Sequence, residues 1–419
     1  MNILVFPCGS EIGLEIHRAL KYIRNFNLIG GTSVKDHGEF VYKNVIENLP
    51  FYNDPLFIEE INNIIELYEI DVIYPTMDSV ITFLSKNKNK IGCKVVAPDV
   101  EVTELCLDKK NTYLKLQNEV LCPNIFENLD DLKYPVFAKP NIGYGSRGAN
   151  IIYNKYELEI QLNKHSDSIV CEYLPGEEYT VDCFSDFNNQ LLFCGARVRD
   201  RVMNGISVST LPVNNAEFVD LINKINKVIG FKGAWFAQFK RNTKNQLVLM
   251  EIAARFGGSS SVHRNKGVNF PLLSIYNLMC TRVDLVINDY NICLDRALDN
   301  KYKVDIEYEH VYIDFDDCLY VNNRINVQIM SFIYQCLNNN KIIYLISKHD
   351  GDLIKKLKEL RVFDIFDEVI HLHKDDMKYK YIGSKNSIFI DDSYAERKEM
   401  KLNVNIHVFS PDMVECLIS

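Results

Sequence analysis

The chain has 419 residues, of which 47% are hydrophobic and 25% charged, and its formal net charge at pH 7 is −9. Interspersed charges argue against a nucleic-acid partner, and no apolar run approaches the roughly 20 residues that span a bilayer, so we expect no membrane partner. The start of the chain shows no basic leader, and the 12 cysteines occur singly, so we expect reduced thiols and a cytoplasmic location.

The first 103 residues alternate short apolar runs with amphipathic segments. Residues 2–6 and 71–74 have the pattern of strands, and residues 11–23 have that of a helix. This alternation predicts a parallel α/β layer.

The pattern changes in residues 104–300, where a helix and then paired strands predict an α+β region. The predicted elements lie at residues 111–118, 136–139, 169–172, 179–184 and 191–196.

A polar stretch at residues 295–305 predicts a linker, because it interrupts the apolar patterns on both sides. Residues 305–419 then return to alternating strands and helices, beginning with a strand at 310–313. The fold class predicted for the whole chain is therefore α/β combined with α+β.

A lysine followed by glycines is the first candidate site. Lys139 ends an apolar run, and residues 143–148 then read GYGSRG. Such a loop can turn its backbone N–H groups toward phosphates, and the lysine supplies a point charge. A glycine-rich hairpin that binds nothing is the alternative for this segment alone.

Polar residues on later strands extend this candidate site. Glu172 ends a predicted strand, and Glu178 follows a short Pro-Gly hinge; a carboxylate suits ribose hydroxyls. Gln238 and Glu251 lie on two successive predicted strands, and oxygen ligands of this kind suit a magnesium ion that bridges phosphates.

In this order the motifs resemble the ATP-grasp superfamily, in particular its carboxylate-amine ligase branch, over roughly residues 1–290. The resemblance implies a Rossmann-like pre-ATP-grasp domain at residues 1–103 and an ATP-grasp domain at residues 104–300. It implies ATP and Mg²⁺ as cofactors and a small-molecule carboxylate and amine as substrates. A homodimer remains open.

The resemblance also assigns roles to single residues. The nucleotide-binding residues would be Lys109, Lys139, Gly145, Ser146, Arg147, Gly148, Glu172, Leu174 and Glu178. Gln238 and Glu251 would hold magnesium, and Arg255 would stabilise the charge that develops during transfer. We expect one well-ordered magnesium ion, or a second ion bound weakly through water, because Ala253 stands where the family usually has an asparagine.

A charged run at residues 197–201 is the candidate substrate-binding segment. Arg199 and Arg201 lie where relatives carry substrate-binding arginines, and a guanidinium group suits a carboxylate or phosphate. An exposed strand with alternating charges is the alternative.

The C-terminal part carries acidic motifs at the ends of predicted strands. The acids are Asp314, Asp316, Asp391 and Asp392, and Ser347 and Lys378 lie between the two acidic segments in the sequence. In this order they resemble haloacid dehalogenase-like phosphatases, which implies a Rossmannoid domain without a cap at residues 305–419.

By that resemblance Asp314 is the nucleophile and Asp316 the general acid/base, while Ser347 and Lys378 hold phosphate. Magnesium ligands would come from Asp314, Asp316, Asp391 and Asp392. Cys318 stands where the family commonly has a threonine.

The expected function is an ATP-dependent carboxylate-amine ligase that acts through an acyl phosphate, with a fused magnesium-dependent phosphatase. One alternative is a kinase that releases a stable phosphorylated product. Another is a nucleotide-binding sensor with a decayed site.

Overall fold

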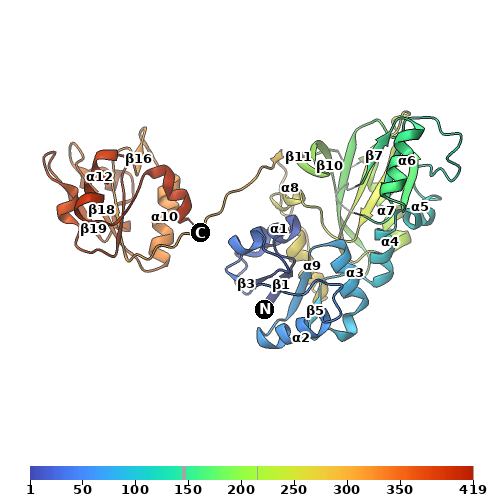
Figure 1. Cartoon of the computed structure of the whole chain (residues 1–419), viewed down its shortest axis with the longest axis horizontal. Helices are drawn as coiled ribbons and strands as arrows, with labels where there is room; N and C mark the ends of the chain where they lie inside the picture. Colours follow the sequence, from blue (N-terminus) through green and yellow to red (C-terminus); the bar gives the residue numbers. More distant parts are fainter. Residues whose placement is uncertain (144–147, 215, 419) are drawn as a thin grey trace. The chain divides into compact units, whose positions relative to one another are not determined.

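The protein is described by a computed structural model that covers residues 1–143, 148–214 and 216–418. It divides into two compact units, Met1–Leu298 and Asp299–Ser419 (Figure 1). Each unit has hydrophobic cores of its own.

Among the residues that the structure describes, no helix is both long and apolar enough to cross a bilayer.

The N-terminal part of the first unit is a five-stranded parallel sheet in the order β3-β2-β1-β4-β5. Ile3 and Val5 of β1 pack in a core with α1 and with α9 (Phe270–Leu278), whereas Leu4 and Phe6 pack in a core with α2 and α3. Covered faces on both sides explain the continuous apolar run of β1. The elements are β1 Asn2–Phe6, α1 Glu11–Leu20, β2 Asn27–Gly31, β3 Asn44–Ile46, α2 Phe57–Leu67, β4 Val72–Pro75, α3 Asp78–Lys86 and β5 Lys94–Val95.

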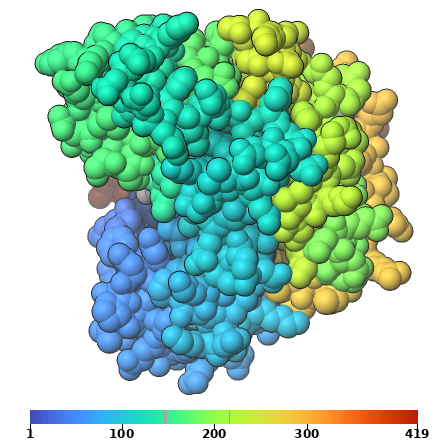
Figure 2. Space-filling model, turned by 90° about the vertical axis from the view of Figure 1, so that its right-hand side faces the viewer, coloured from blue at the N-terminus to red at the C-terminus, as the bar shows by residue number. Residues whose placement is uncertain are grey.

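A three-stranded antiparallel sheet, in the order β7-β6-β8, follows two short helices. Leu158 of α6 packs with Val136 of β6 and Val170 of β8, so this helix covers one face of the sheet. The elements are α4 Val100–Leu107, α5 Lys109–Leu116, β6 Val136–Pro140, β7 Asn150–Ile152, α6 Lys155–Lys164 and β8 Ser168–Glu172. In Figure 2 the green residues of this part lie above the blue residues of the parallel sheet.

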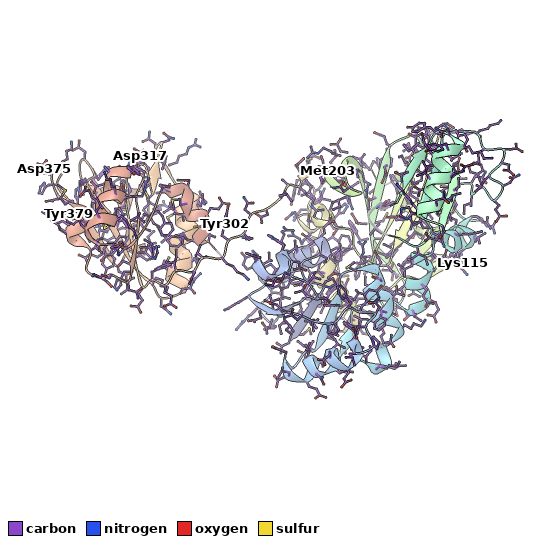
Figure 3. All side chains as sticks on the ribbon, in the orientation of Figure 1. Lys115, Met203, Tyr302, Asp317, Asp375 and Tyr379 are labelled. Carbon is purple, nitrogen blue, oxygen red and sulfur yellow. The ribbon has the colours of Figure 1, made fainter. Side chains whose placement is uncertain are left out.

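A six-stranded antiparallel sheet, in the order β13-β12-β9-β10-β11-β14, completes the first unit. Phe218, Ile222 and Ile225 of α7 lie at helical spacing and pack against one face. The elements are β9 Glu178–Ser185, β10 Leu191–Met203, β11 Ile206–Pro212, α7 Ala216–Ile229, β12 Gly233–Arg241, β13 Leu247–Ala253, α8 Ser261–Arg264, α9 Phe270–Leu278 and β14 Leu294–Asp295. The exposed Met203 marks the end of β10 in Figure 3.

The second unit is built on a five-stranded parallel sheet in the order β19-β18-β15-β20-β21. Phe332 of α10 and Leu357 of α11 pack on one face, and Met400 of α12 packs on the other. The elements are β15 His310–Ile313, β16 Tyr320–Val321, β17 Arg324–Ile325, α10 Val327–Asn338, β18 Ile342–Ser347, α11 Leu353–Glu359, β19 Glu368–His371, β20 Ser387–Ile390, α12 Tyr394–Asn403 and β21 His407–Phe409.

The structure confirms a mixed α/β fold, with the parallel and antiparallel parts in the predicted order. Two details differ. The predicted helix at 11–23 ends at Leu20, and the predicted linker starts inside β14, because Leu294 and Asp295 pair with β11. The units divide between Leu298 and Asp299, and the further boundary between residues 103 and 104 stays a prediction.

Candidate active sites

The first unit contains a cavity of about 380 Å³ between its two antiparallel sheets, lined by residues of β6, β8, β9, β10, β12 and β13. This volume is in the range of small-molecule sites. Many predicted site residues lie together on its wall, namely Lys109, Lys139, Glu172, Leu174, Glu178, Arg199, Gln238, Glu251 and Arg255.

Two buried lysines on this wall contact only neutral partners among the described residues. Lys139 Nζ donates to Tyr113 Oη at 2.7 Å and to the Met250 carbonyl at 3.0 Å. Lys109 Nζ donates to the carbonyls of Asn141 and Gly143 at 3.2 and 3.1 Å. Burial lowers the pKa of both ammonium groups, although the nearby Glu251 partly opposes this. A bound anion would compensate both charges.

The residues predicted to face adenine stand beside apolar walls. Glu172 ends β8, and its Oε1 accepts from the backbone N–H of Asn124 at 3.0 Å. Leu174 is buried, and Phe137 and Met250 also line the cavity. A polar edge beside apolar side chains has the character that a purine requires.

The predicted magnesium ligands are neighbours across two strands. Gln238 of β12 pairs directly with Glu251 of β13. With its amide oriented to satisfy both partners, Gln238 donates to Glu251 at 3.2 Å and accepts from Arg199 at 2.8 Å. Ala253 is buried opposite Phe236, so it adds no ligand.

The arginines on this wall are held by carboxylates. Arg255 donates to both oxygens of Asp78 at 2.9 Å and lies over the Phe236 ring. Because Asp78 begins α3, this pair joins the parallel sheet layer to the large antiparallel sheet. Arg199 Nε lies 2.8 Å from Glu178, so the predicted ribose-binding carboxylate is also an ion-pair partner.

The remaining predicted residues of this unit lie elsewhere. Arg201 is exposed on β10 and pairs with Asp295 at 2.7 Å, away from the cavity lining. Gly145, Ser146 and Arg147 lie outside the described residues. Gly148 has φ +73°, and a Cβ there would lie 2.9 Å from His165 Nε2, so the position requires glycine.

Sequence reasoning missed a buried cluster next to this site. Asp182 accepts from Arg197 Nε at 2.6 Å, and His263 Nε2 lies 3.5 Å from the same carboxylate. Burial lowers the pKa of His263 to about 4, so this imidazole is neutral at pH 7. The available signal was polar Thr180 and Asp182 at alternate positions of β9, each followed by an apolar residue.

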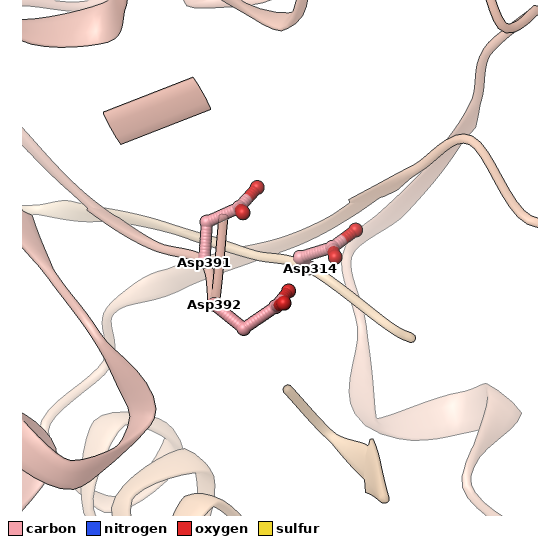
Figure 4. Close-up of side chains that lie close together, drawn as sticks. All are labelled: Asp314, Asp391 and Asp392. Atoms are coloured by element: carbon pink, nitrogen blue, oxygen red, sulfur yellow. The ribbon is translucent and has the colours of Figure 1, made fainter. Parts of the chain in front are cut away.

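The second unit gathers three carboxylates at the ends of its central strands (Figure 4). Oxygens of Asp314, Asp391 and Asp392 lie within 4.8 Å of one another. Lys378 bridges two of them, at 2.8 Å from Asp314 and 2.6 Å from Asp391. Burial raises the pKa of Asp314 to about 6, although Lys378 opposes the shift. The carboxylates suit a hard divalent cation.

Asp316 stands apart from this acidic cluster. Its two carboxylate oxygens lie 3.0 and 2.9 Å from His349 Nδ1, and they are not among the clustered ligand atoms. Ser347 is buried at the end of β18, and Cys318 is buried with its Sγ 3.8 Å from the Ile390 carbonyl. The structure thus separates the predicted acid/base residue from the other acids.

A protein-family model described as "ATP-grasp in the biosynthetic pathway with Ter operon" matches residues 164–290. The carbamoyl phosphate synthase large chain of Methanobrevibacter smithii is 23% identical over 66% of this chain and 29% of its own length. That of Thermoplasma acidophilum is 24% identical over 90% of this chain and 38% of its own length. The chain therefore spans well under half the length of these relatives.

Solved structures share the fold of the first unit at low sequence identity. The biotin carboxylase domain of Hydrogenobacter thermophilus 2-oxoglutarate carboxylase matches with TM-score 0.57 and 18% identity, over 67% of this chain and 70% of that chain. N5-carboxyaminoimidazole synthetase from Staphylococcus aureus matches with TM-score 0.57 and 18% identity, over 68% and 79%. L-amino acid ligase from Bacillus licheniformis matches with TM-score 0.55 and 17% identity, over 66% and 74%.

The family model lies within the first unit, and the haloacid dehalogenase resemblance of the second unit stays a prediction. The family model over residues 164–290 and the carbamoyl phosphate synthase relatives make this chain similar to proteins of the ATP-grasp superfamily, and the solved structures share its fold.

Proposed function

We propose that the first unit is an ATP-dependent carboxylate-amine ligase that acts through an acyl phosphate. The pair of buried lysines carries this proposal, because Lys109 and Lys139 hold positive charge against a cavity and, among the described residues, donate hydrogen bonds only to neutral partners. Triphosphate oxygens are the anions that best match two such cations beside an apolar base pocket. Two of the similar structures contain ADP.

The cavity residues fit the parts of the nucleotide. Lys109 and Lys139 would hold phosphates under the loop of Gly145, Ser146, Arg147 and Gly148, while Glu172, Leu174 and Glu178 would take the base and ribose. Gln238 and Glu251 would hold magnesium, which neutralises phosphate charge when it is bound. One protein-anchored ion is proposed, since Ala253 offers no oxygen.

The proposed reaction has two steps. An oxygen of the substrate carboxylate attacks the γ-phosphorus, the bond to ADP breaks, and an acyl phosphate forms. The amine then attacks the carbonyl carbon, inorganic phosphate leaves, and the nitrogen loses a proton to give the amide. Arg255, held by Asp78, would stabilise the charge on the transferring phosphoryl group. An enclosed cavity would keep water from the intermediate.

The second proposed activity is a magnesium-dependent phosphatase in the second unit, supported by the acidic cluster around Asp314. Asp314 would attack phosphorus, Asp316 would protonate the leaving oxygen, and water would then release phosphate from Asp314. Lys378 and Ser347 would hold the phosphate oxygens. Asp314, Asp391 and Asp392 would hold the cation that neutralises charge in this site.

The fusion supports a coupled sequence, in which the phosphatase removes phosphate from the ligase's substrate or product. The segment between β14 and β15 tethers the two units. A short tether of this kind raises the effective concentration of one unit's product at the other unit to roughly the millimolar range. A phosphorylated amine that is coupled and then dephosphorylated has the required chemistry.

The test is an ADP-release screen of carboxylic acids against amines, followed by mass spectrometry of the products. A ligase releases ADP and phosphate only when both substrates are present, and it yields a mass equal to acid plus amine minus water. ADP release with a phosphorylated product and no free phosphate would instead identify a kinase. ATP binding without turnover in every mixture would identify a nucleotide sensor.

A further inference from the structure

Two buried donors without partners lie side by side on the cavity wall of the first unit. Thr180 of β9 pairs in register with Arg197 of β10 on one side and with Gln238 of β12 on the other. Thr180 is 1% exposed and Arg197 is 2% exposed. The hydroxyl of Thr180 and the Nη1 of Arg197 make no hydrogen bond among the described residues.

Unpaired buried donors are costly, and most native structures satisfy them. Both residues line the same cavity. Gln238, Thr180 and Arg197 are cross-strand neighbours on three adjacent strands, and Gln238 is a proposed magnesium ligand. A ligand oxygen in the cavity would satisfy both donors at once. Their juxtaposition therefore indicates a binding subsite next to the phosphate-transfer position.

The Arg197 guanidinium is fixed in place by its surroundings. Its Nε donates to the fully buried Asp182 at 2.6 Å. Gly257 packs against the same group, since a Cβ at that position would lie 2.9 Å from Nη2. The remaining nitrogen, Nη1, is thus a rigid donor, and a prepositioned donor loses little entropy on binding.

The charge of this cluster favours a carboxylate over a phosphate as the ligand. Asp182 already compensates the Arg197 charge, and the neighbouring His263 is neutral at pH 7. The subsite therefore offers two hydrogen-bond donors with little net positive charge. A phosphate dianion requires several cationic donors, whereas one oxygen of a carboxylate requires only such a pair.

We propose that Arg197 and Thr180 bind one oxygen of the substrate carboxylate and leave its second oxygen free for phosphoryl transfer near Gln238. This assignment rests on the proposed ligase function and identifies the part of the cavity that selects the acid substrate. It favours acids over esters and amides, because a carboxylate oxygen accepts a stronger, charge-assisted hydrogen bond from Arg197, and because esters and amides have no second anionic oxygen to attack the γ-phosphorus.

The experiment measures acid binding by thermal shift and calorimetry on the full chain with magnesium and the non-hydrolysable analogue AMP-PNP. The probes are formate, acetate, glycine, succinate and L-glutamate, each beside its corresponding amide. We expect at least one acid to bind and its amide not to bind. In Arg197→Lys the acid affinity falls about tenfold or more, as for a lost charge-assisted bond, and in Thr180→Val it falls about two- to tenfold.

Thr180→Val adds a readout that a purely structural hydroxyl would not give. Removing an unsatisfied buried hydroxyl raises the unfolding midpoint without ligand, while the affinity for the acid falls. Thr210→Val is the matched control, because the Thr210 hydroxyl is buried in the same sheet but already donates to the Val198 carbonyl. It should leave acid affinity unchanged.

Acid binding that survives both Arg197→Lys and Thr180→Val would overturn the proposal, as would equal binding of acid and amide or no acid binding at all. If Arg197→Lys does not fold, Thr180→Val alone decides. Failure of magnesium AMP-PNP to bind would instead refute the proposed function, so the two failures are distinguishable.

Discussion

The two units bury opposite charges at their candidate sites. In the first unit, Lys109 and Lys139 are buried against neutral partners, and burial lowers their pKa. In the second, Asp314 and Asp391 are buried and share Lys378, and burial raises the pKa of both carboxyl groups. Each unit thus keeps a charge that it does not fully compensate. This difference supports the proposal of an anionic ligand for the first site and of a cation for the second.

The largest effect is expected for Asp314→Asn, which removes the proposed nucleophile. Phosphatase activity toward p-nitrophenyl phosphate with magnesium should fall by at least about 10⁴-fold, while ATP-dependent ligation continues and a phosphorylated amide accumulates. The exposed Asp375, labelled in Figure 3, offers the control variant Asp375→Asn. If Asp314→Asn retains phosphatase activity, the proposed role of Asp314 as the nucleophile of the second unit is refuted.

The same variant also tests the buried negative charge. The pKa of Asp314 is raised from 3.8 to about 6, so the folded state loses stability as pH rises through this window and stays lower above it. Without metal at pH 7, Asp314→Asn should therefore raise the unfolding free energy of the second unit, on the order of 1–3 kcal/mol. Thermal unfolding without metal measures this difference. A lower stability of Asp314→Asn than of the parent protein would contradict an uncompensated negative charge in the second unit.

Lys139→Met is the corresponding change in the first unit. Loss of a cation at the phosphates should lower ATP turnover by about 10²–10³-fold, while the unfolding midpoint without nucleotide stays level or rises. Lys115→Met on the exposed side of α5 is the control (Figure 3). Unchanged ADP release by Lys139→Met would show that the buried lysine has only a structural role.

A smaller effect concerns the neutral His263, whose pKa burial lowers from 6.5 to about 4. As pH falls from 6.5 toward 4, the His263 side chain takes up a proton in the unfolded chain but not in the folded one. The free energy of unfolding therefore decreases over this range, by up to about 3 kcal/mol, and is unaffected by this group above pH 6.5. His263→Gln should flatten this pH dependence. Urea unfolding followed by fluorescence of Trp235, the single tryptophan and a buried residue of the first unit, measures it. Parallel pH profiles for the two proteins would refute the assignment.

The smallest effect is expected for Ala253→Asn, which adds an amide oxygen near Glu251. The magnesium concentration for half-maximal turnover should fall a few-fold, on the order of the gain from one neutral ligand. Magnesium titrations of ADP release give the value. An unchanged titration would mean that position 253 does not face the metal.

Residues at strand ends were the predictable part of the site. Lys139 and Glu172 end apolar runs, and Glu251 lies in one, so the sequence pattern alone placed each of them on a strand. That β6 and β8 belong to one sheet and β13 to another was visible only in the structure. The order of parallel and antiparallel regions was predictable for the same reason, since periodicity is local.

Contacts between distant segments were beyond the sequence pattern. His263 meets Asp182 only through the packing of α8 on the large sheet, and Arg255 meets Asp78 across 177 positions of the chain. Arg197 and Thr180 become neighbours only through the register of β9 and β10. Register depends on tertiary pairing, which is why their partnerless donors appeared only in the structure.

Calorimetric titration of the full chain with magnesium AMP-PNP and with adenosine tests the central claim most directly. If the buried lysines of the first unit exist to bind phosphates, the triphosphate analogue should bind at least about 100-fold more tightly than adenosine, as expected for two charge-assisted contacts. Equal affinities, or no binding of the triphosphate analogue, would contradict the account.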